Sequence, residues 1–160
     1  MPIKVGEKLP DVELQVVKPS GTEKIRTNAL FAGKKTVLFS VPGAFTPTCS
    51  AKHLPGFIER AGEIRAKGVD QIVCLSVNDG FVMSAWAKDR GAGDKVPLLA
   101  DGSCEFTRAL DLELDATGFG MGTRGQRFAA IIDDGKVQKL FIEKPGAFEV
   151  SSAEAVLQQL

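Results

Sequence analysis

Residues 36–49 read TVLFSVPGAFTPTC and join an apolar run to the expected start of a helix. The run is almost continuously apolar up to Val41, which is typical of a central strand buried on both faces. A Pro-Gly pair then ends the strand. Thr46 and Pro47 stand where the N-cap residue and the first helical residue are expected. The stretch therefore predicts a buried strand, a tight turn and a capped helix in direct succession.

Cys49 falls in the first turn of that predicted helix. The N–H groups there have no intrahelical partners, and the helix dipole favours negative charge. A thiol in this field loses its proton more readily, and the thiolate is the form that attacks electrophiles and is oxidised. Most free cysteines are buried and structural, but the strand, the turn and the capped helix start favour a reactive Cys49.

Length and composition indicate an ordinary soluble globular protein. The 160 residues suffice for one domain with a substantial core, and no repeat or low-complexity linker marks a boundary within residues 1–160. The formal net charge is zero, which predicts neither a nucleic-acid partner nor an anionic membrane partner. No run is apolar enough for a membrane span, and the first residues lack signal-peptide or transit-peptide character. We therefore expect a cytoplasmic location.

The three cysteines are Cys49, Cys74 and Cys104. Their odd number and wide spacing argue against a disulfide scaffold. There is no C-x-x-C pair and only one histidine, His53, so we expect no metal site. Reactive thiols and core thiols remain as alternatives.

The hydrophobic pattern predicts an α/β fold with a mixed central sheet, helices on both faces and an N-terminal strand hairpin. Strands are expected over residues 12–17, 23–26, 36–41, 71–77, 96–100, 126–132 and 136–142. Helices are expected over residues 47–67, from the cap at 78–79 to about 91, over 103–110 and after 151. An Asp-Gly pair between the last two strands predicts a hairpin.

Two details of the predicted helices concern their ends and continuity. Pro55 lies inside the run 47–67, which predicts a kink or break near that residue. Ser151 and Glu154 have the spacing of a capping box before the last helix.

The run PGAFTPTC at 42–49 resembles the active-site segment of peroxiredoxins, in particular the plant type II and atypical two-cysteine (peroxiredoxin 5-like) branch. The P-x-x-x-T-x-x-C pattern with a downstream Arg-Phe strand is specific, whereas a lone T-x-x-C is weak. The resemblance covers essentially the whole chain and includes HLPGF at 53–57, CLSVND at 74–79, AW at 85–86, LAD at 99–101 and QRF at 126–128.

This resemblance implies a thioredoxin-like fold and a thiol peroxidase that needs no cofactor. It implies that the enzyme reduces hydrogen peroxide and alkyl hydroperoxides and serves antioxidant defence and redox homeostasis. Cys49 would attack one peroxide oxygen, release water or an alcohol, and become a sulfenic acid. Thr46 would orient the peroxide, and Arg127 would stabilise the thiolate and the leaving oxygen. A guanidinium suits that task because it stays charged and has forked donors.

The segment before Cys49 would bind and shield the substrate. By resemblance, Pro42 would exclude water, and the backbone N–H groups from Ala44 to Cys49 would supply further donors. Gly43 and Phe45 complete this segment.

Several residues have a second interpretation. Thr46 fits an N-cap role as well as a catalytic one, since a hydroxyl both donates and accepts. Arg127 would ordinarily be an exposed strand residue, and Arg124 is a lesser candidate at the rim of the site. His53 lies one helical turn after Cys49; it either tunes the thiolate or only packs nearby, and we leave it out of the catalytic set.

The second half of the catalytic cycle has two alternatives. In the plant type II branch, a cysteine at the spacing of Cys74 is proposed as the resolving thiol. A buried core thiol is an equal alternative, because a disulfide requires Cα atoms within roughly 7 Å. Cys104 is expected to be a packing residue. No cysteine occurs at 146–151, where the vertebrate branch has its resolving thiol. An external reductant is therefore implied, either glutaredoxin with glutathione or thioredoxin.

The resemblance also suggests a homodimer packed around the active-site loops, with Phe45 and Phe119 as core or interface residues. A thioredoxin-type oxidoreductase is a competing hypothesis. It predicts a C-x-x-C at the helix start, where Thr46 replaces the first cysteine. A redox-sensing binding protein is a third hypothesis, which requires Cys49 but not Arg127.

Overall fold

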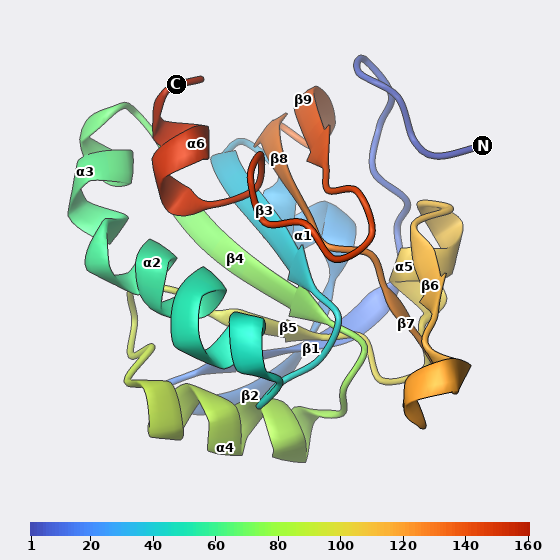
Figure 1. Ribbon diagram of the computed structural model, residues 1–160. Coiled ribbons are helices and arrows are strands. Elements are labelled where there is room, and N and C mark those ends of the chain that lie inside the picture. Colours follow the sequence, from blue (N-terminus) through green and yellow to red (C-terminus); the bar gives the residue numbers. More distant parts are fainter.

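Seven strands form one mixed sheet in the order β2-β1-β5-β4-β3-β8-β9. The computed structural model describes residues 1–160 (Figure 1). The strands are β1 (Glu13–Lys18), β2 (Gly21–Arg26), β3 (Lys35–Val41), β4 (Gln71–Ser76), β5 (Leu98–Ala100), β8 (Phe128–Asp133) and β9 (Lys136–Ile142). Strands β3, β4 and β5 are parallel to one another, and every other pair in this sheet is antiparallel.

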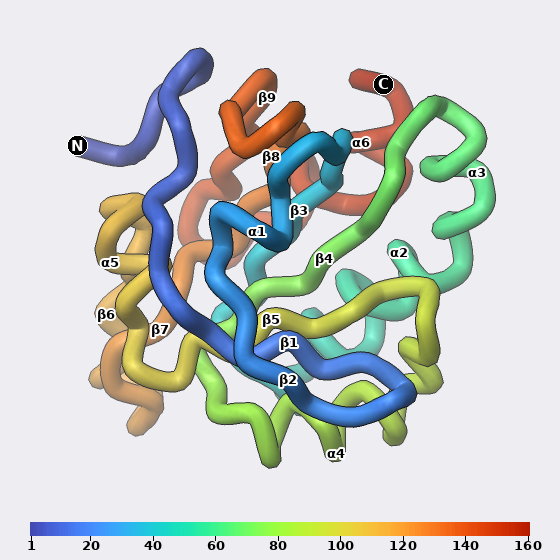
Figure 2. Tube along the Cα trace, turned by 180° about the vertical axis from the view of Figure 1, so that it is seen from behind, coloured from blue at the N-terminus to red at the C-terminus, as the bar shows by residue number.

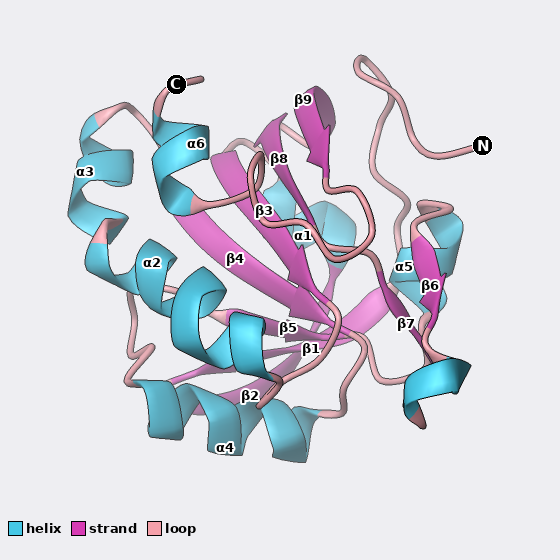
Figure 3. Ribbon diagram, viewed as in Figure 1, coloured by secondary structure: helices cyan, strands magenta, loops and turns pink.

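Helices cover both faces of the sheet, as Figure 3 shows. On one face lie α2 (Leu54–Glu59), α3 (Ala61–Ala66), α4 (Gly80–Arg90) and α6 (Ala153–Leu157). On the other face, seen from behind in Figure 2, lie α1 (Thr27–Phe31) and α5 (Glu105–Ala109). The predicted fold class is confirmed.

The central strands are buried on both faces because they are apolar at consecutive positions. In β3, Val37 and Phe39 point into the core beneath α2 to α4, whereas Leu38 points into the opposite core. This alternation is the period of two expected of a strand. Since β3 and β4 are parallel, their carboxyl ends meet at one edge of the sheet, and the cysteine-bearing helix starts there.

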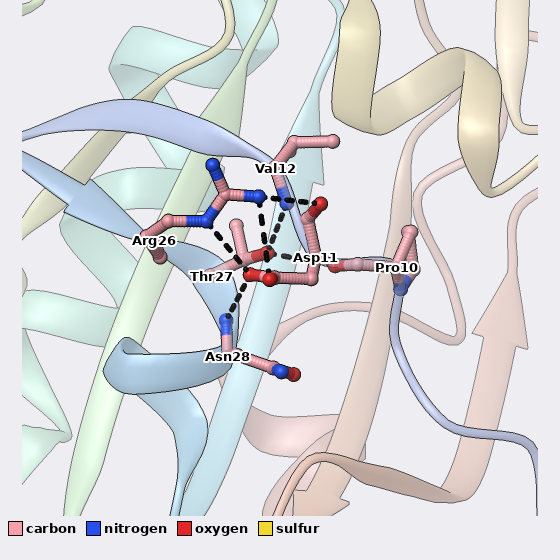
Figure 4. A network of polar contacts seen from close by, with 6 residues as sticks. All are labelled: Pro10, Asp11, Val12, Arg26, Thr27 and Asn28. Atoms are coloured by element: carbon pink, nitrogen blue, oxygen red, sulfur yellow. Dashed lines mark hydrogen bonds and ion pairs between the residues drawn. The ribbon is translucent and has the colours of Figure 1, made fainter.

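A set of polar contacts, which we call the N-terminal network, joins the segment before β1 to the segment after β2 (Figure 4). The Thr27 hydroxyl donates to the Pro10 carbonyl at 2.7 Å and accepts from the Val12 N–H at 3.0 Å. The Arg26 guanidinium donates to the Asp11 carboxylate at 3.3 Å and 3.4 Å. The same carboxylate accepts from the Asn28 N–H at the start of α1. Together these contacts close the chain segment that leads into β1.

The predicted helix over 47–67 consists of three pieces. It begins at Pro47, passes through a π-helical turn η1 (Cys49–His53), and continues as α2 and α3. Pro55 lies in the first turn of α2, where its missing N–H is tolerated. The turn before it closes over five residues, from the Leu54 N–H to the Cys49 carbonyl. The break between α2 and α3 lies at Arg60, with φ −102° and ψ 12°, and not at Pro55.

The region before β8 also differs from expectation. The predicted strand over 126–132 starts only at Phe128. The preceding β7 (Thr123–Gly125) pairs with β6 (Glu113–Asp115) in a separate two-stranded sheet, close to the short helix η2 (Thr117–Phe119). The three residues of β6 and of β7 are too few to show any periodicity. As a result, Arg127 lies in the bend between two sheets.

The hairpin between β8 and β9 is confirmed. Asp134 and Gly135 both have positive φ, 49° and 79°, as a two-residue turn of this type requires. None of the helices is both long and apolar enough to cross a membrane.

Candidate active site

Cys49 lies at the start of η1, close to the carboxyl end of β3, and exposes none of its surface. The helix start is held in place by α4. The Trp86 indole N–H donates to the Ser50 hydroxyl at 2.8 Å, immediately after the cysteine. The buried strand and this contact together fix where the Cys49 sulfur points.

Arg127 is the guanidinium that reaches the cysteine. Its Nη2 donates to Cys49 Sγ at 3.2 Å, across 78 residues of chain. Arg124, the other candidate, lies elsewhere: its guanidinium donates to the carbonyl groups of Met121 and Val77, both at 3.0 Å. A guanidinium at this distance can donate a hydrogen bond to sulfur and offset the negative charge of a thiolate.

His53 contacts the other end of the same guanidinium. Its Nδ1 lies 2.7 Å from Arg127 Nη1, and its Nε2 lies 2.9 Å from the Ser151 carbonyl oxygen. A carbonyl only accepts, so Nε2 carries the proton and Nδ1 accepts from Arg127. Burial, together with the Arg127 charge, lowers the pKa of His53 to about 3. The ring is therefore neutral at physiological pH.

The sequence pattern alone does not place His53 in the site. Its spacing of four residues from Cys49 was the available signal. The pattern does not reveal its partners, because Ser151 is 98 residues away and its local sequence predicts a capping box. In the structure Ser152 is the N-cap of α6 and accepts from the Ala155 N–H at 3.1 Å. The Ser151 hydroxyl instead donates to Glu143 at 2.6 Å.

Thr46 occupies the N-cap position, but its hydroxyl does not cap the helix. The Thr46 carbonyl accepts the first helical hydrogen bond from the Ser50 N–H at 2.9 Å, as expected of an N-cap residue. The hydroxyl instead donates to the Gly43 carbonyl at 2.7 Å. Because its proton is used there, the oxygen presents lone pairs to any further partner.

The loop before the helix supplies fewer donors than expected. The Ala44 N–H donates to Asn78 Oδ1 at 3.0 Å and so is not available to the site. The N–H groups of Thr48 and Cys49 make no hydrogen bond within the chain, as is usual for a first helical turn. Phe45 adopts a left-handed backbone, with φ 66°, and is 51% exposed. A bulky residue in that conformation is strained, which is typical of functional loops.

A cavity of about 160 Å³ opens beside Arg127. Pro42 and Phe148 are among its lining residues. The Arg127 Cζ lies 5.7 Å from the centre of the Phe148 ring, within cation–π range. The cavity thus joins an apolar wall to the guanidinium that contacts Cys49.

The other two cysteines are also buried and unpaired. Cys74 is in the middle of β4, opposite Phe39 of β3, and belongs to the same core cluster as Cys49. Burial raises the pKa of Cys74 well above its usual value, and neighbouring Cys49 adds to the rise. Cys104 precedes α5 with a left-handed φ of 61°, and burial raises its pKa as well. A protonated thiol is a weak nucleophile.

Comparisons with known proteins agree on one family. A sequence profile described as Redoxin matches residues 4–157. The chain is 54% identical over 162 residues to Peroxiredoxin-2E, chloroplastic, of Arabidopsis thaliana. This match covers 99% of this chain and 69% of that protein. The chain is 49% identical over 160 residues to Peroxiredoxin-2B of the same plant, with 99% of both chains covered.

A solved structure gives the same result. Reduced Prx3 of Vibrio vulnificus, crystallised in complex with hydrogen peroxide, matches with a TM-score of 0.93 and 51% identity over 98% of each chain. These similarities confirm the predicted resemblance, including its plant type II branch. Members of this family act on peroxides with thioredoxin-type reductants. The chain therefore belongs to the peroxiredoxin family and is a thiol-dependent peroxidase.

Proposed function

We propose that the Cys49 thiolate reduces hydrogen peroxide and alkyl hydroperoxides by direct attack on one peroxide oxygen. The sulfur lone pair forms the S–O bond as the O–O bond breaks. The leaving oxygen departs with the electron pair, takes up a proton, and becomes water or an alcohol. Cys49 is left as a sulfenic acid. The observation that carries this proposal is the 3.2 Å contact from Arg127 Nη2 to Cys49 Sγ.

The neighbouring groups have complementary roles in this proposal. Thr46 accepts a hydrogen bond from the peroxide O–H, since its own proton is engaged by Gly43. Arg127 and the unpaired Cys49 N–H donate to the oxygen on which charge develops. The cavity beside Arg127 accommodates an alkyl tail against Pro42 and Phe148. The hydrogen peroxide bound by Vibrio vulnificus Prx3 supports a small peroxide as substrate.

The segment 42–45 forms the wall that keeps water from the sulfur in this proposal. Pro42 lines the cavity and lacks an N–H, so it adds no donor that would hold water there. Gly43 keeps this wall closely packed, because an added Cβ would lie 3.2 Å from the Met121 and Thr46 side chains and would push on both. Ala44 and Phe45 complete the turn, and Phe45 lies beside Trp86 with ring centres 6.5 Å apart.

We propose that an external thiol regenerates Cys49, with glutaredoxin and glutathione or thioredoxin as the reductant. Cys49 exposes no surface, so the helix start must open before another thiol can attack the sulfur. The π-helical turn Cys49–His53 is where we expect it to open, because such turns are common at functional sites and their hydrogen bonding is irregular.

Cys74 is the internal alternative for resolution. It is fully buried and its raised pKa keeps it protonated, so it could act only after the same opening. Non-reducing mass analysis after one equivalent of peroxide, with wild type and Cys74→Ser, separates the two routes. A disulfide between Cys49 and Cys74 in the wild type would support Cys74. A sulfenic acid that persists on Cys49 would support an external reductant.

We propose that two copies of this chain associate through an aromatic surface beside the site. Its exposed members are Phe45, 51% exposed, Phe81, 90% exposed, and Phe119, 85% exposed. They belong to the loop before Cys49, to the start of α4 and to η2, and Figure 1 places α4 and η2 toward the same end of the molecule. Burying these three rings against a second copy would remove their apolar surface from water, which favours association. Sedimentation of wild type and Phe119→Glu should show a dimer and a monomer, respectively.

We also propose a cytoplasmic location. The three unpaired cysteines fit a reducing compartment. A chloroplast is also reducing and is named for one relative, so cell fractionation decides between them.

The central experiment measures the reaction of Cys49 with hydrogen peroxide in single-turnover kinetics. Wild type, Cys49→Ser and Arg127→Gln are compared, with dimedone labelling to detect the sulfenic acid. We expect no labelling in Cys49→Ser and a loss of about a hundredfold or more in rate for Arg127→Gln. An unchanged rate in Arg127→Gln would remove the proposed role of that residue. Labelling at another cysteine would overturn the assignment of Cys49.

A further inference from the structure

We propose that His53 is a positioning residue for Arg127, and that Glu143 fixes the loop that holds His53 in the required orientation. This inference rests on the proposed role of Arg127 at Cys49. The residues involved, which we call the active-site network, are Cys49, Arg127, His53, Ser151 and Glu143.

The first step concerns the shape of the guanidinium. Arg127 uses both terminal nitrogens: Nη1 donates to His53 Nδ1 at 2.7 Å and Nη2 donates to Cys49 Sγ at 3.2 Å. The guanidinium is planar and rigid, so fixing one nitrogen fixes the direction of the other. The acceptor on His53 therefore sets where the Nη2 proton points.

The second step concerns the imidazole itself. Its Nε2 donates to the Ser151 carbonyl at 2.9 Å, which leaves Nδ1 as an acceptor facing Arg127. The ring exposes none of its surface and packs among three phenylalanines. Its centre lies 4.8 Å from Phe39, 4.9 Å from Phe148 and 5.7 Å from Phe57. Neither its tautomer nor its tilt is free to change.

The third step explains why the Ser151 carbonyl stays in place. Glu143 is 7% exposed, and one oxygen, Oε2, accepts from the N–H groups of Glu149, Val150 and Ser151 at 2.8–2.9 Å. The Ser151 hydroxyl donates to the same oxygen at 2.6 Å. Successive N–H groups that converge on an anion fix a turn firmly. The Glu143 N–H also donates to the Arg127 carbonyl at 3.0 Å, which closes the network on its starting residue.

A neutral acceptor has a chemical advantage over a carboxylate here. A carboxylate in place of His53 would form an ion pair with Arg127 and offset the charge that the thiolate needs. The imidazole accepts the hydrogen bond without adding a negative charge. The Glu143 carboxylate acts indirectly, because it holds the loop that carries Ser151 and does not contact the guanidinium.

Two matched variants separate the two hydrogen bonds of His53. In His53→Asn, the amide oxygen lies two bonds from Cβ, as Nδ1 does, and keeps the acceptor for Arg127. In His53→Gln, the amide nitrogen lies three bonds from Cβ, as Nε2 does, and keeps only the donor to Ser151. We expect His53→Gln to lower the rate of Cys49 oxidation by hydrogen peroxide about tenfold to a hundredfold, and His53→Asn to lower it less.

The decisive measurement is the rate of Cys49 oxidation when the same two substitutions are made in the Arg127→Gln background. A positioning residue has nothing left to position there, so His53→Gln should cause no further loss. Equal losses in His53→Asn and His53→Gln, or a His53→Gln loss that is additive with Arg127→Gln, would overturn the inference. If Arg127→Gln alone left the rate unchanged, the proposed function of Arg127 would fail instead, and the positioning role with it.

Glu143→Gln supplies a second variant if the His53 variants do not fold. Glutamine keeps one oxygen but loses the charge, so we expect a rate loss of several-fold in the wild-type background and none in Arg127→Gln. Thermal unfolding is measured for every variant. A Glu143→Gln protein with an unchanged rate, or with an equal loss in both backgrounds, would contradict the inference.

Discussion

The N-terminal network and the active-site network each contain an arginine and a carboxylate, but they use these two kinds of side chain in opposite ways. In the first, Arg26 pairs directly with the Asp11 carboxylate, and both side chains are partly exposed, at 55% and 39%. In the second, Arg127 is half-buried and faces a neutral imidazole and a thiol. The Asp11–Arg26 pair offsets its own charges and is screened by water. In the active-site network, the arginine charge is kept for the sulfur, and the Glu143 carboxylate is connected to the guanidinium only through Ser151 and His53.

The largest expected effect comes from changing the donor geometry of each arginine. Arg127→Lys keeps the charge but loses the fork that spans His53 and Cys49, so we expect the rate of peroxide reduction to fall about a hundredfold. Arg26→Lys is the matched control and should leave that rate unchanged. Stopped-flow measurement of Cys49 oxidation checks both. Equal rates for Arg127→Lys and wild type would show that charge alone suffices at the site.

The second largest effect is the loss of stability when the carboxylate of each network, Glu143 or Asp11, is removed. Burial alone would raise the pKa of Glu143, but its four hydrogen bonds outweigh burial and hold the pKa below its usual value. Glu143→Ala would leave three N–H groups and a hydroxyl without their acceptor. We expect a loss of about 2–4 kcal/mol in the free energy of unfolding. Asp11→Ala is the control and should cost less, as measured by denaturant titration of both variants. A Glu143→Ala protein as stable as Asp11→Ala would contradict the anchoring role.

The third effect concerns pH, because only the active-site network buries a histidine. The pKa of His53 is about 3 in the folded protein and about 6.5 when unfolded. Below pH 6.5 the unfolded chain therefore binds a proton that the folded chain does not. The contribution of His53 to the free energy of unfolding is therefore fully present above pH 6.5. It falls by about 1.4 kcal/mol per pH unit from there toward pH 3. His53→Asn removes this group, so its unfolding free energy should fall less steeply than that of wild type between pH 6.5 and 5. Parallel slopes would show that His53 is protonated in the folded protein.

The two networks also show what the sequence could predict. The central strands over 36–41 and 71–77 were predictable because consecutive apolar residues mark burial on both faces. The helix start at Pro47 followed from local turn chemistry. The contact between Arg127 and Cys49 spans 78 residues, and only family resemblance indicated it. No local sequence pattern distinguishes Arg127, which contacts the Cys49 sulfur, from Arg124, which contacts backbone carbonyl groups.

The predicted helix caps also differ from the structure because of contacts with residues that are distant in the sequence or in a neighbouring turn. Ser151 and Ser152 are both good cap residues, so the pattern assigned the cap to Ser151, one residue too early. The tertiary contact with Glu143 decides which serine caps. The Thr46 hydroxyl was free to cap by local rules, but the turn at Gly43 brings a carbonyl within 2.7 Å and takes its proton. Long-range partners therefore override local preference at the positions closest to the sulfur.

The smallest expected effect is the salt dependence of the N-terminal network. The carboxylate of Asp11 has a lowered pKa, first through its hydrogen bond from Arg26 and then through the Asn28 N–H. Since the ion pair is exposed, added salt should weaken it. Arg26→Gln should lower the thermal midpoint slightly in low salt, and 1 M sodium chloride should remove most of that difference. Arg127→Gln, measured in the same two buffers, should show a rate loss that salt does not restore, because its partners are buried. If high salt restored the Arg127→Gln rate as it restores the Arg26→Gln midpoint, the two arginines would not differ in the way proposed here.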